Sequence, residues 1–161
     1  MKIGIVGLGL IGGSMAKALK MRTKHTVYGM DSNESVRLKA ILLDAIDHEL
    51  TEENLVEMDM VMIALYPKDA LDFANHYASQ LKKGALLIDL CGVKRVVSEP
   101  LHQLAIENGF IYIGGHPMAG REFSGFTYST ETLFDGASMI LVPYAGTPIE
   151  LVQEIKQLFY R

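Results

Sequence analysis

The chain has 161 residues, of which 49% are hydrophobic and 21% charged, which fits one folded domain and excludes an intrinsically disordered chain. Its formal net charge of −4 argues against nucleic acid or an anionic membrane as a partner, and no apolar run approaches the roughly 18 residues of a membrane-spanning helix. The single cysteine, Cys91, fits a reducing cytoplasm, and we predict no metal site.

Apolar runs of strand length alternate along the chain with longer segments of helical period. Strands are predicted at residues 2–6, 25–30, 46–48, 60–65, 85–90, 110–113 and 137–142, and helices at residues 10–21, 33–44, 67–84, 94–108 and 148–161. This alternation is typical of a parallel sheet with crossover helices. The predicted fold is therefore α/β, a doubly wound, mostly parallel sheet of the Rossmann type with helices on both faces, forming one domain over residues 1–161.

Breaker residues set the bounds of two of these helices. Pro67 at the start and Gly84 at the end bound the third helix, following the usual preference for proline at the first helical position and glycine after the last. Gly109 is the expected stop of the fourth helix. Pro100 lies inside that helix, so the helix either bends there or begins near Ser98.

The run Gly7-Leu8-Gly9-Leu10-Ile11-Gly12 directly follows the first predicted strand and opens the first helix. In this context the first glycine allows a tight turn, the second lets the backbone approach a pyrophosphate, and the third lets the helix pack on the sheet. The free N–H groups and the dipole of the helix N-terminus favour the anion. We therefore predict that a dinucleotide is bound by Gly7, Leu8, Gly9, Leu10, Ile11 and Gly12.

Asp31 ends the second predicted strand, 19 positions after Gly12 and close to the spacing of about 20 found in such sites. Its carboxylate can accept hydrogen bonds from the ribose hydroxyls and would repel a 2′-phosphate, and no basic residue follows until Arg37. The predicted cofactor is therefore NAD rather than NADP. The alternative reading of Asp31 is a helix cap, a role for which Ser32 and Asn33 also qualify.

His116 follows the strand predicted at residues 110–113 and begins a block with Pro117 beside it. Ligands of doubly wound sheets bind at the carboxyl ends of the strands, so His116 falls where a substrate is expected. A histidine there can act as a general base near neutral pH. Residues 115–136 are rich in Gly, Ser and Thr and predict a long, partly helical loop, a kind of segment that is often functional.

Three blocks of the sequence resemble one enzyme family over essentially the whole chain. They are Gly7-Leu8-Gly9-Leu10-Ile11-Gly12-Gly13-Ser14, Asp89-Leu90-Cys91-Gly92-Val93-Lys94, and Gly115-His116-Pro117-Met118-Ala119-Gly120 followed by Ser124-Gly125. The sequence is similar to the prephenate and arogenate dehydrogenases of tyrosine biosynthesis. The block around His116 is the specific part of the resemblance, because many dehydrogenases share the glycine run.

The resemblance implies an NAD-dependent oxidative decarboxylation. The ring carbon that bears the hydroxyl would lose a hydride to the cofactor, His116 would take the hydroxyl proton, and loss of carbon dioxide would make the ring aromatic. Prephenate would give 4-hydroxyphenylpyruvate, and arogenate would give tyrosine. Leu65 and Asp89 are expected to contact the cofactor, and Lys94 and Glu122 to lie at the substrate, with a solvated surface charge as the alternative for the last two.

The sequence departs from the family in two respects. Gly92 stands where many members carry a serine that orients the substrate and the histidine, and Cys91 before it is expected to be a small buried residue. The family also continues into a helical domain that forms a homodimer and supplies a substrate-binding arginine, and this chain ends before it. Arogenate dehydrogenase and a stand-alone NAD(H)-binding module without turnover are therefore kept as alternatives, whereas the His116 block argues against a reductase of another small acid.

Overall fold

A seven-stranded sheet in the order β3-β2-β1-β4-β5-β6-β7 forms the centre of the structure, a computed structural model that describes residues 1–160. All neighbouring strands are parallel except β6 and β7. The strands are β1 Lys2–Val6, β2 Thr26–Met30, β3 His48–Glu49, β4 Met60–Ile63, β5 Leu86–Asp89, β6 Ile111–Pro117 and β7 Met139–Pro143. The predicted mostly parallel, doubly wound sheet is confirmed.

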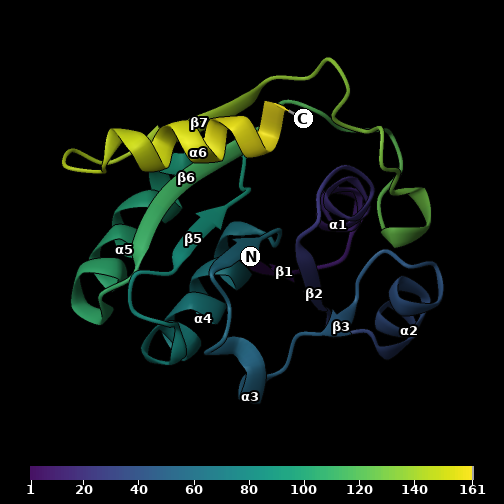
Figure 1. Ribbon diagram of the computed structural model, residues 1–161, viewed down its shortest axis with the longest axis horizontal. Coiled ribbons are helices and arrows are strands. Elements are labelled where there is room, and N and C mark those ends of the chain that lie inside the picture. Colours follow the sequence, from purple (N-terminus) through teal and green to yellow (C-terminus); the bar gives the residue numbers. More distant parts are fainter. Residues whose placement is uncertain (161) are drawn as a thin grey trace.

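Helices cover both faces of this sheet (Figure 1). They are α1 Leu10–Arg22, α2 Glu34–Leu42, α3 Glu52–Leu55, α4 Pro67–Tyr77, α5 Lys94–Asn108 and α6 Ile149–Tyr160. Alternate residues of the central strands point to opposite faces and are buried on both. One face packs Val61 and Leu87 against α4 and α5, and the other packs Met62 and Ile88 against α1, α2 and α6. Burial on both sides explains why the central strands are continuously apolar.

Two helical predictions needed correction. The helix that begins at Pro67 ends at Tyr77, and a 3-10 turn over Ala78–Gln80 precedes Gly84, which has a φ of +78°. The short helix α3 was not predicted, although Thr51 and Asn54 form a capping box at its start. Four residues are too few for apolar periodicity to be visible in the sequence.

Helix α5 runs unbroken from Lys94 to Asn108 with Pro100 inside it, so a later start near Ser98 is wrong. Proline has no N–H for the carbonyl four residues earlier, which belongs to the half-exposed Val96 and can therefore be hydrated. The predicted stop is confirmed, because Gly109 is left-handed with a φ of 78° and donates its N–H to Ala105 O at 2.8 Å.

Strand β6 extends four residues past the predicted end at Ile113. Its added length pairs antiparallel with β7, from Gly114 opposite Val142 to Pro117 opposite Met139. A β-carbon on Gly115 would lie 2.8 Å from the main-chain oxygen of Asp89, so glycine is needed for the close approach of β5. The two glycines thus belong to the strand and do not mark its end, and His116 is a residue of β6.

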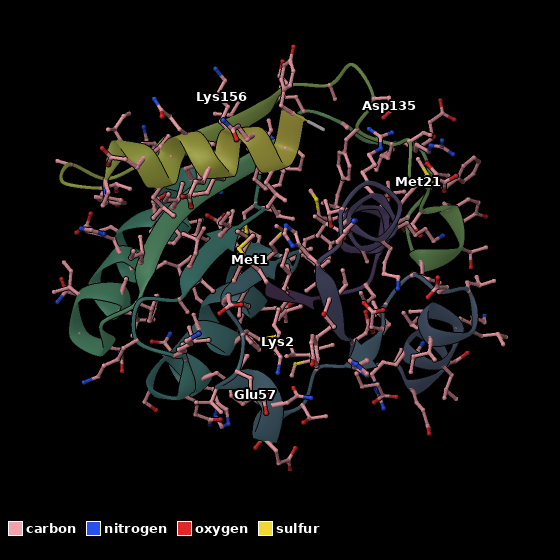
Figure 2. The ribbon with its side chains drawn as sticks, viewed as in Figure 1. Met1, Lys2, Met21, Glu57, Asp135 and Lys156 are labelled. Carbon is pink, nitrogen blue, oxygen red and sulfur yellow. The ribbon has the colours of Figure 1, made fainter. Side chains whose placement is uncertain are left out.

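The last helix, α6, is amphipathic and lies across β6 and β7 (Figure 1). Ile155 faces the core at 2% exposure, whereas Lys156 points away from the sheet (Figure 2). The predicted helix at this end is confirmed through Tyr160, and its final residue, Arg161, lies outside the described residues. Within residues 1–160, no helix combines the length and the apolar character that crossing a membrane requires.

Candidate active site

The turn between β1 and α1 has space for glycine alone at two of its positions. Gly7 has a φ of +88° and donates its N–H to Met30 O at 2.8 Å. A β-carbon on Gly7 would lie 2.6 Å from Ala64 O, and one on Gly12 would lie 1.8 Å from Gly7 O. These contacts bring α1 directly onto the carboxyl end of β1, which is the packing that the glycine run predicts.

Gly9, by contrast, has open space where a side chain would begin, with no atom within 4 Å of an added β-carbon. It is the N-cap of α1 and supplies no side-chain cap. Within residues 1–160, no hydrogen bond engages the main-chain N–H groups of residues 9–12. The free N–H donors and the helix dipole favour the pyrophosphate of a dinucleotide, and the open space at Gly9 lets it reach the backbone.

The three apolar residues of the run differ in what they offer a ligand. Leu8 is fully buried and belongs to the core, so its side chain is turned away from any ligand. Leu10 and Ile11 are half-buried at the start of α1. Leu8 can therefore contact a cofactor through its main chain. The cofactor contacts of Leu10 and Ile11 remain predictions.

Asp31 ties the end of β2 to the glycine turn. Its Oδ2 accepts the Leu8 N–H at 2.8 Å, and its Oδ1 accepts the Asn33 N–H at 2.9 Å. Asn33 is the N-cap of α2 and accepts the Ser35 N–H at 3.0 Å, so Asp31 is not the helix cap. The carboxylate is half-buried beside the turn, which leaves lone pairs for the ribose hydroxyls of a dinucleotide.

Asp89, at the end of β5, is fully buried, and its carboxylate is occupied by three protein donors. Tyr112 O–H donates to Oδ2 at 2.7 Å and the Cys91 N–H donates to Oδ1 at 3.0 Å, while Lys94 forms an ion pair with Oδ1. The side chain of Asp89 therefore joins β5, β6 and α5, and a contact with cofactor from this residue is left to its main chain. Tyr112 could not be singled out from the sequence, because it has the strand register of an ordinary core residue.

Burial and the adjacent Asp89 carboxylate raise the pKa of the Tyr112 hydroxyl, so it stays a hydrogen-bond donor at neutral pH. Burial also raises the pKa of the Cys91 thiol to about 11, with the same carboxylate adding to the effect. Cys91 is 4% exposed and its thiol contacts Leu65 O at 3.5 Å. The prediction of a small buried cysteine is confirmed, and a thiol in this state is a poor nucleophile.

His116 is half-buried near the carboxyl end of β6 and faces the loop between β5 and α5. A β-carbon at Gly92 would lie 3.4 Å from Nε2 and 3.6 Å from Cε1 of the His116 ring. A side chain at position 92, where the family resemblance implies a serine, would therefore contact the imidazole. Sequence motifs that are 24 positions apart meet here because β5 and β6 are neighbours.

The other two predicted substrate residues lie differently. Lys94 is half-buried and paired with Asp89, so it is not a solvated surface charge. Glu122 is exposed in the segment after β6 and makes no hydrogen bond or ion pair within residues 1–160. Leu65 is half-buried, with its Cδ2 2.7 Å from where a β-carbon on Gly7 would lie. Their contacts with a ligand remain predictions.

A cavity of about 410 Å³ lies between α1, α6 and the segment before β7 and includes none of the predicted site residues. An ion pair between Arg22 and Asp135, 2.5 Å long, crosses its rim; Asp135 is labelled in Figure 2. The candidate site is instead the open carboxyl edge of the sheet, where the glycine turn and His116 lie.

We expect Gly92→Ser to be accommodated without loss of stability, because the added β-carbon meets the His116 ring at ordinary van der Waals distances of 3.4 and 3.6 Å. Gly115→Ala is the matched control, since its β-carbon would press on Asp89 O at 2.8 Å. Overpacking of this kind costs about 1–3 kcal/mol, which lowers Tm by at least about 2 °C in a domain of this size. Calorimetry of both variants tests this, and equal losses of Tm would contradict the open space at position 92.

A glycine turn between the first strand and helix of a doubly wound sheet, with a carboxylate ending β2, defines a nucleotide-binding domain of the dehydrogenase type. Comparison with known proteins is more specific. Residues 15–161 match the family described as prephenate dehydrogenase, nucleotide-binding domain. The chain belongs to this family.

Individual relatives agree with this family. The chain is 31% identical over 158 residues to a prephenate dehydrogenase of Bacillus subtilis, covering 96% of this chain and 42% of that protein. Among solved structures, the Synechocystis arogenate dehydrogenase matches with a TM-score of 0.90 at 30% identity, over 98% of this chain and 55% of that one. A prephenate dehydrogenase from A. aeolicus, in complex with hydroxyphenyl propionate and NAD+, matches with a TM-score of 0.88 at 29% identity, over 99% and 56%. The chain thus spans about half the length of these relatives.

Proposed function

We propose that this chain is the NAD-binding, catalytic half of a dehydrogenase that oxidatively decarboxylates prephenate to 4-hydroxyphenylpyruvate in tyrosine biosynthesis. The observation that carries the proposal is the common location of the glycine turn and His116. Both lie at the carboxyl edge of the sheet, and the imidazole is half-buried there, with its Nε2 toward the loop at Gly92. Ligands of this fold bind at that edge.

When bound, NAD supplies the acceptor for the hydride that leaves the substrate ring. The N–H groups at the start of α1 hold its pyrophosphate, with Gly9 leaving the approach open. The Asp31 carboxylate accepts hydrogen bonds from the ribose hydroxyls. The hydrogen bond that it accepts from the Leu8 N–H fixes this carboxylate against the turn. Leu65 lines the same edge beside Gly7, and the main chain at Asp89 ends the next strand.

His116 is the proposed general base. Its imidazole accepts the proton of the substrate hydroxyl as the carbon bearing that hydroxyl loses its hydride. The bond to the carboxylate then breaks, carbon dioxide leaves, and the electron pair of that bond completes the aromatic ring. Lys94 and Glu122 are proposed to contact the substrate, and the ion pair of Lys94 with Asp89 keeps the Lys94 ammonium group at the start of α5.

Arogenate is the second candidate substrate, because the Synechocystis arogenate dehydrogenase matches with a TM-score of 0.90. The two substrates differ only in the side chain, which carries a carbonyl in prephenate and an amine in arogenate. We further propose a cytoplasmic setting and, because the relatives are about twice as long, turnover only together with a second, helical half that forms a homodimer. A chain that binds NAD(H) without turnover is the third candidate.

Titration of the chain with NADH, followed by the fluorescence of the reduced nicotinamide, is expected to give a Kd in the micromolar range. Prephenate and arogenate are then each supplied with NAD to this chain and to a version that continues into its native downstream sequence, and NADH absorbance is followed. A well-folded sample that binds no NADH would overturn the cofactor assignment. Inactivity of the longer version on both substrates would overturn the proposed reaction.

A further inference from the structure

Arg37 of α2 places its guanidinium against Asp31, the residue that follows β2. Its Nη1 donates to the main-chain oxygen of Asp31 at 2.7 Å, and its Nε donates to Glu49 Oε2 at 3.2 Å. The side chain is 25% exposed, so the guanidinium lies at the surface and is fixed from two sides. Neither contact is a feature of the glycine run, and the sequence alone gave Arg37 no role beyond being the first basic residue after Asp31.

The cation and the ribose-binding carboxylate meet at one residue. Arg37 binds the main chain of Asp31, while the side chain of Asp31 accepts the Leu8 N–H of the glycine turn. A ligand whose ribose bonds the Asp31 carboxylate would therefore bind at the residue to which this guanidinium is itself bonded. Two of the five N–H donors of Arg37 are used within residues 1–160, which leaves three for another acceptor.

Charge decides what those remaining donors can bind. A guanidinium matches the oxygens of a phosphate, and an arginine near this position is how the fold accommodates a 2′-phosphate. Here the guanidinium pairs with the Glu49 carboxylate and bonds the main-chain oxygen of Asp31, whose own carboxylate is a second negative charge on the same residue. The local sum is therefore negative, and a dianionic phosphate is repelled although a suitable donor is present.

We propose that Arg37 is a specificity-determining residue at the ribose end of the cofactor site. Its guanidinium is suited to bind a phosphate, and the negative charges of Asp31 and Glu49 oppose that binding. With both carboxylates present the site takes a 2′-hydroxyl, and with either neutralised Arg37 binds the 2′-phosphate of NADP(H). This inference rests on the proposed NAD binding and goes beyond it, because it assigns the discrimination to three residues instead of to Asp31 alone.

The test is direct binding of NADH and NADPH, measured by fluorescence titration or calorimetry and independent of turnover. Asp31→Asn is expected to lower the affinity for NADH and to raise the affinity for NADPH, each about tenfold. The ribose loses a hydrogen bond to a charged group, and the Arg37 cation becomes accessible to the 2′-phosphate. Glu49→Gln keeps an acceptor for Arg37 Nε and is expected to strengthen NADPH several-fold with Asp31 intact. The double variant Asp31→Asn with Arg37→Gln is expected to lose the whole gain.

Arg37→Gln alone completes the double-variant cycle, so that the gain in NADPH affinity from Asp31→Asn is compared with and without the Arg37 guanidinium. If the wild-type chain binds no NADH, the proposed function fails. If it binds NADH but the Asp31→Asn gain in NADPH persists without Arg37, or neither carboxylate variant gains NADPH affinity, this inference fails while the proposed function stands. Should Asp31→Asn not fold, the Glu49→Gln comparison with and without Arg37→Gln decides the matter alone.

Discussion

His116→Asn is expected to lower kcat of the longer, two-part enzyme proposed above by on the order of a hundredfold or more. Positioned general bases contribute roughly 10²–10⁴ to a rate, and asparagine has similar size but cannot take a proton. The half-buried ring lies against Gly92 and not in the core, so the substitution should leave the fold and the cofactor site intact. Initial rates of NADH formation measure the loss.

A matched control is His76→Asn, because His76 is exposed on α4, where its ring lies edge-on to the ring of Tyr77. We expect this control to keep the wild-type rate, and both variants to bind NADH with unchanged Kd. Such a result would separate a role in proton transfer from one in binding. A rate for His116→Asn close to that of His76→Asn would remove His116 from the mechanism.

The fold could be predicted from the sequence because the apolar pattern of each segment matches its burial between the sheet and the helices. The run over residues 60–65 is apolar throughout, and β4 is indeed covered on both faces. The prediction was wrong where tertiary contacts override a local signal. Gly114 and Gly115 are strand breakers by composition, yet they extend β6 because β7 pairs with it and β5 approaches too closely for a side chain.

The same division holds for the candidate site. The glycine turn and Asp31 are close in sequence to the strands that position them, so spacing alone indicated their geometry. The buried network of Asp89, Tyr112 and Lys94 joins β5, β6 and α5, and nothing in the sequence pattern connects those positions. The cofactor contact expected of Asp89 stays a prediction, and the role of its carboxylate in stabilising the loop that carries Gly92 toward His116 was missed.

Gly9→Ala and Gly12→Ala are expected to damage the glycine turn in opposite ways. The β-carbon of Gly9→Ala enters open space, and position 9 has an ordinary φ of −72°, so Tm should stay near wild type. That methyl group nevertheless occupies the approach to the free N–H groups of α1, where the pyrophosphate is proposed to bind. We expect NADH affinity to fall by on the order of a hundredfold, as the loss of one or two charge-assisted hydrogen bonds would produce.

Gly12→Ala is expected to lower stability first. Its β-carbon would overlap Gly7 O at 1.8 Å, so α1 must move away from β1. Overpacking of this severity costs at least about 3 kcal/mol and should lower Tm by roughly 6 °C or more. Calorimetry and NADH titration of the pair distinguish a glycine that makes room for a ligand from one that makes room for a helix. Loss of stability in Gly9→Ala, or wild-type NADH binding by it, would contradict the open position 9 as the pyrophosphate approach.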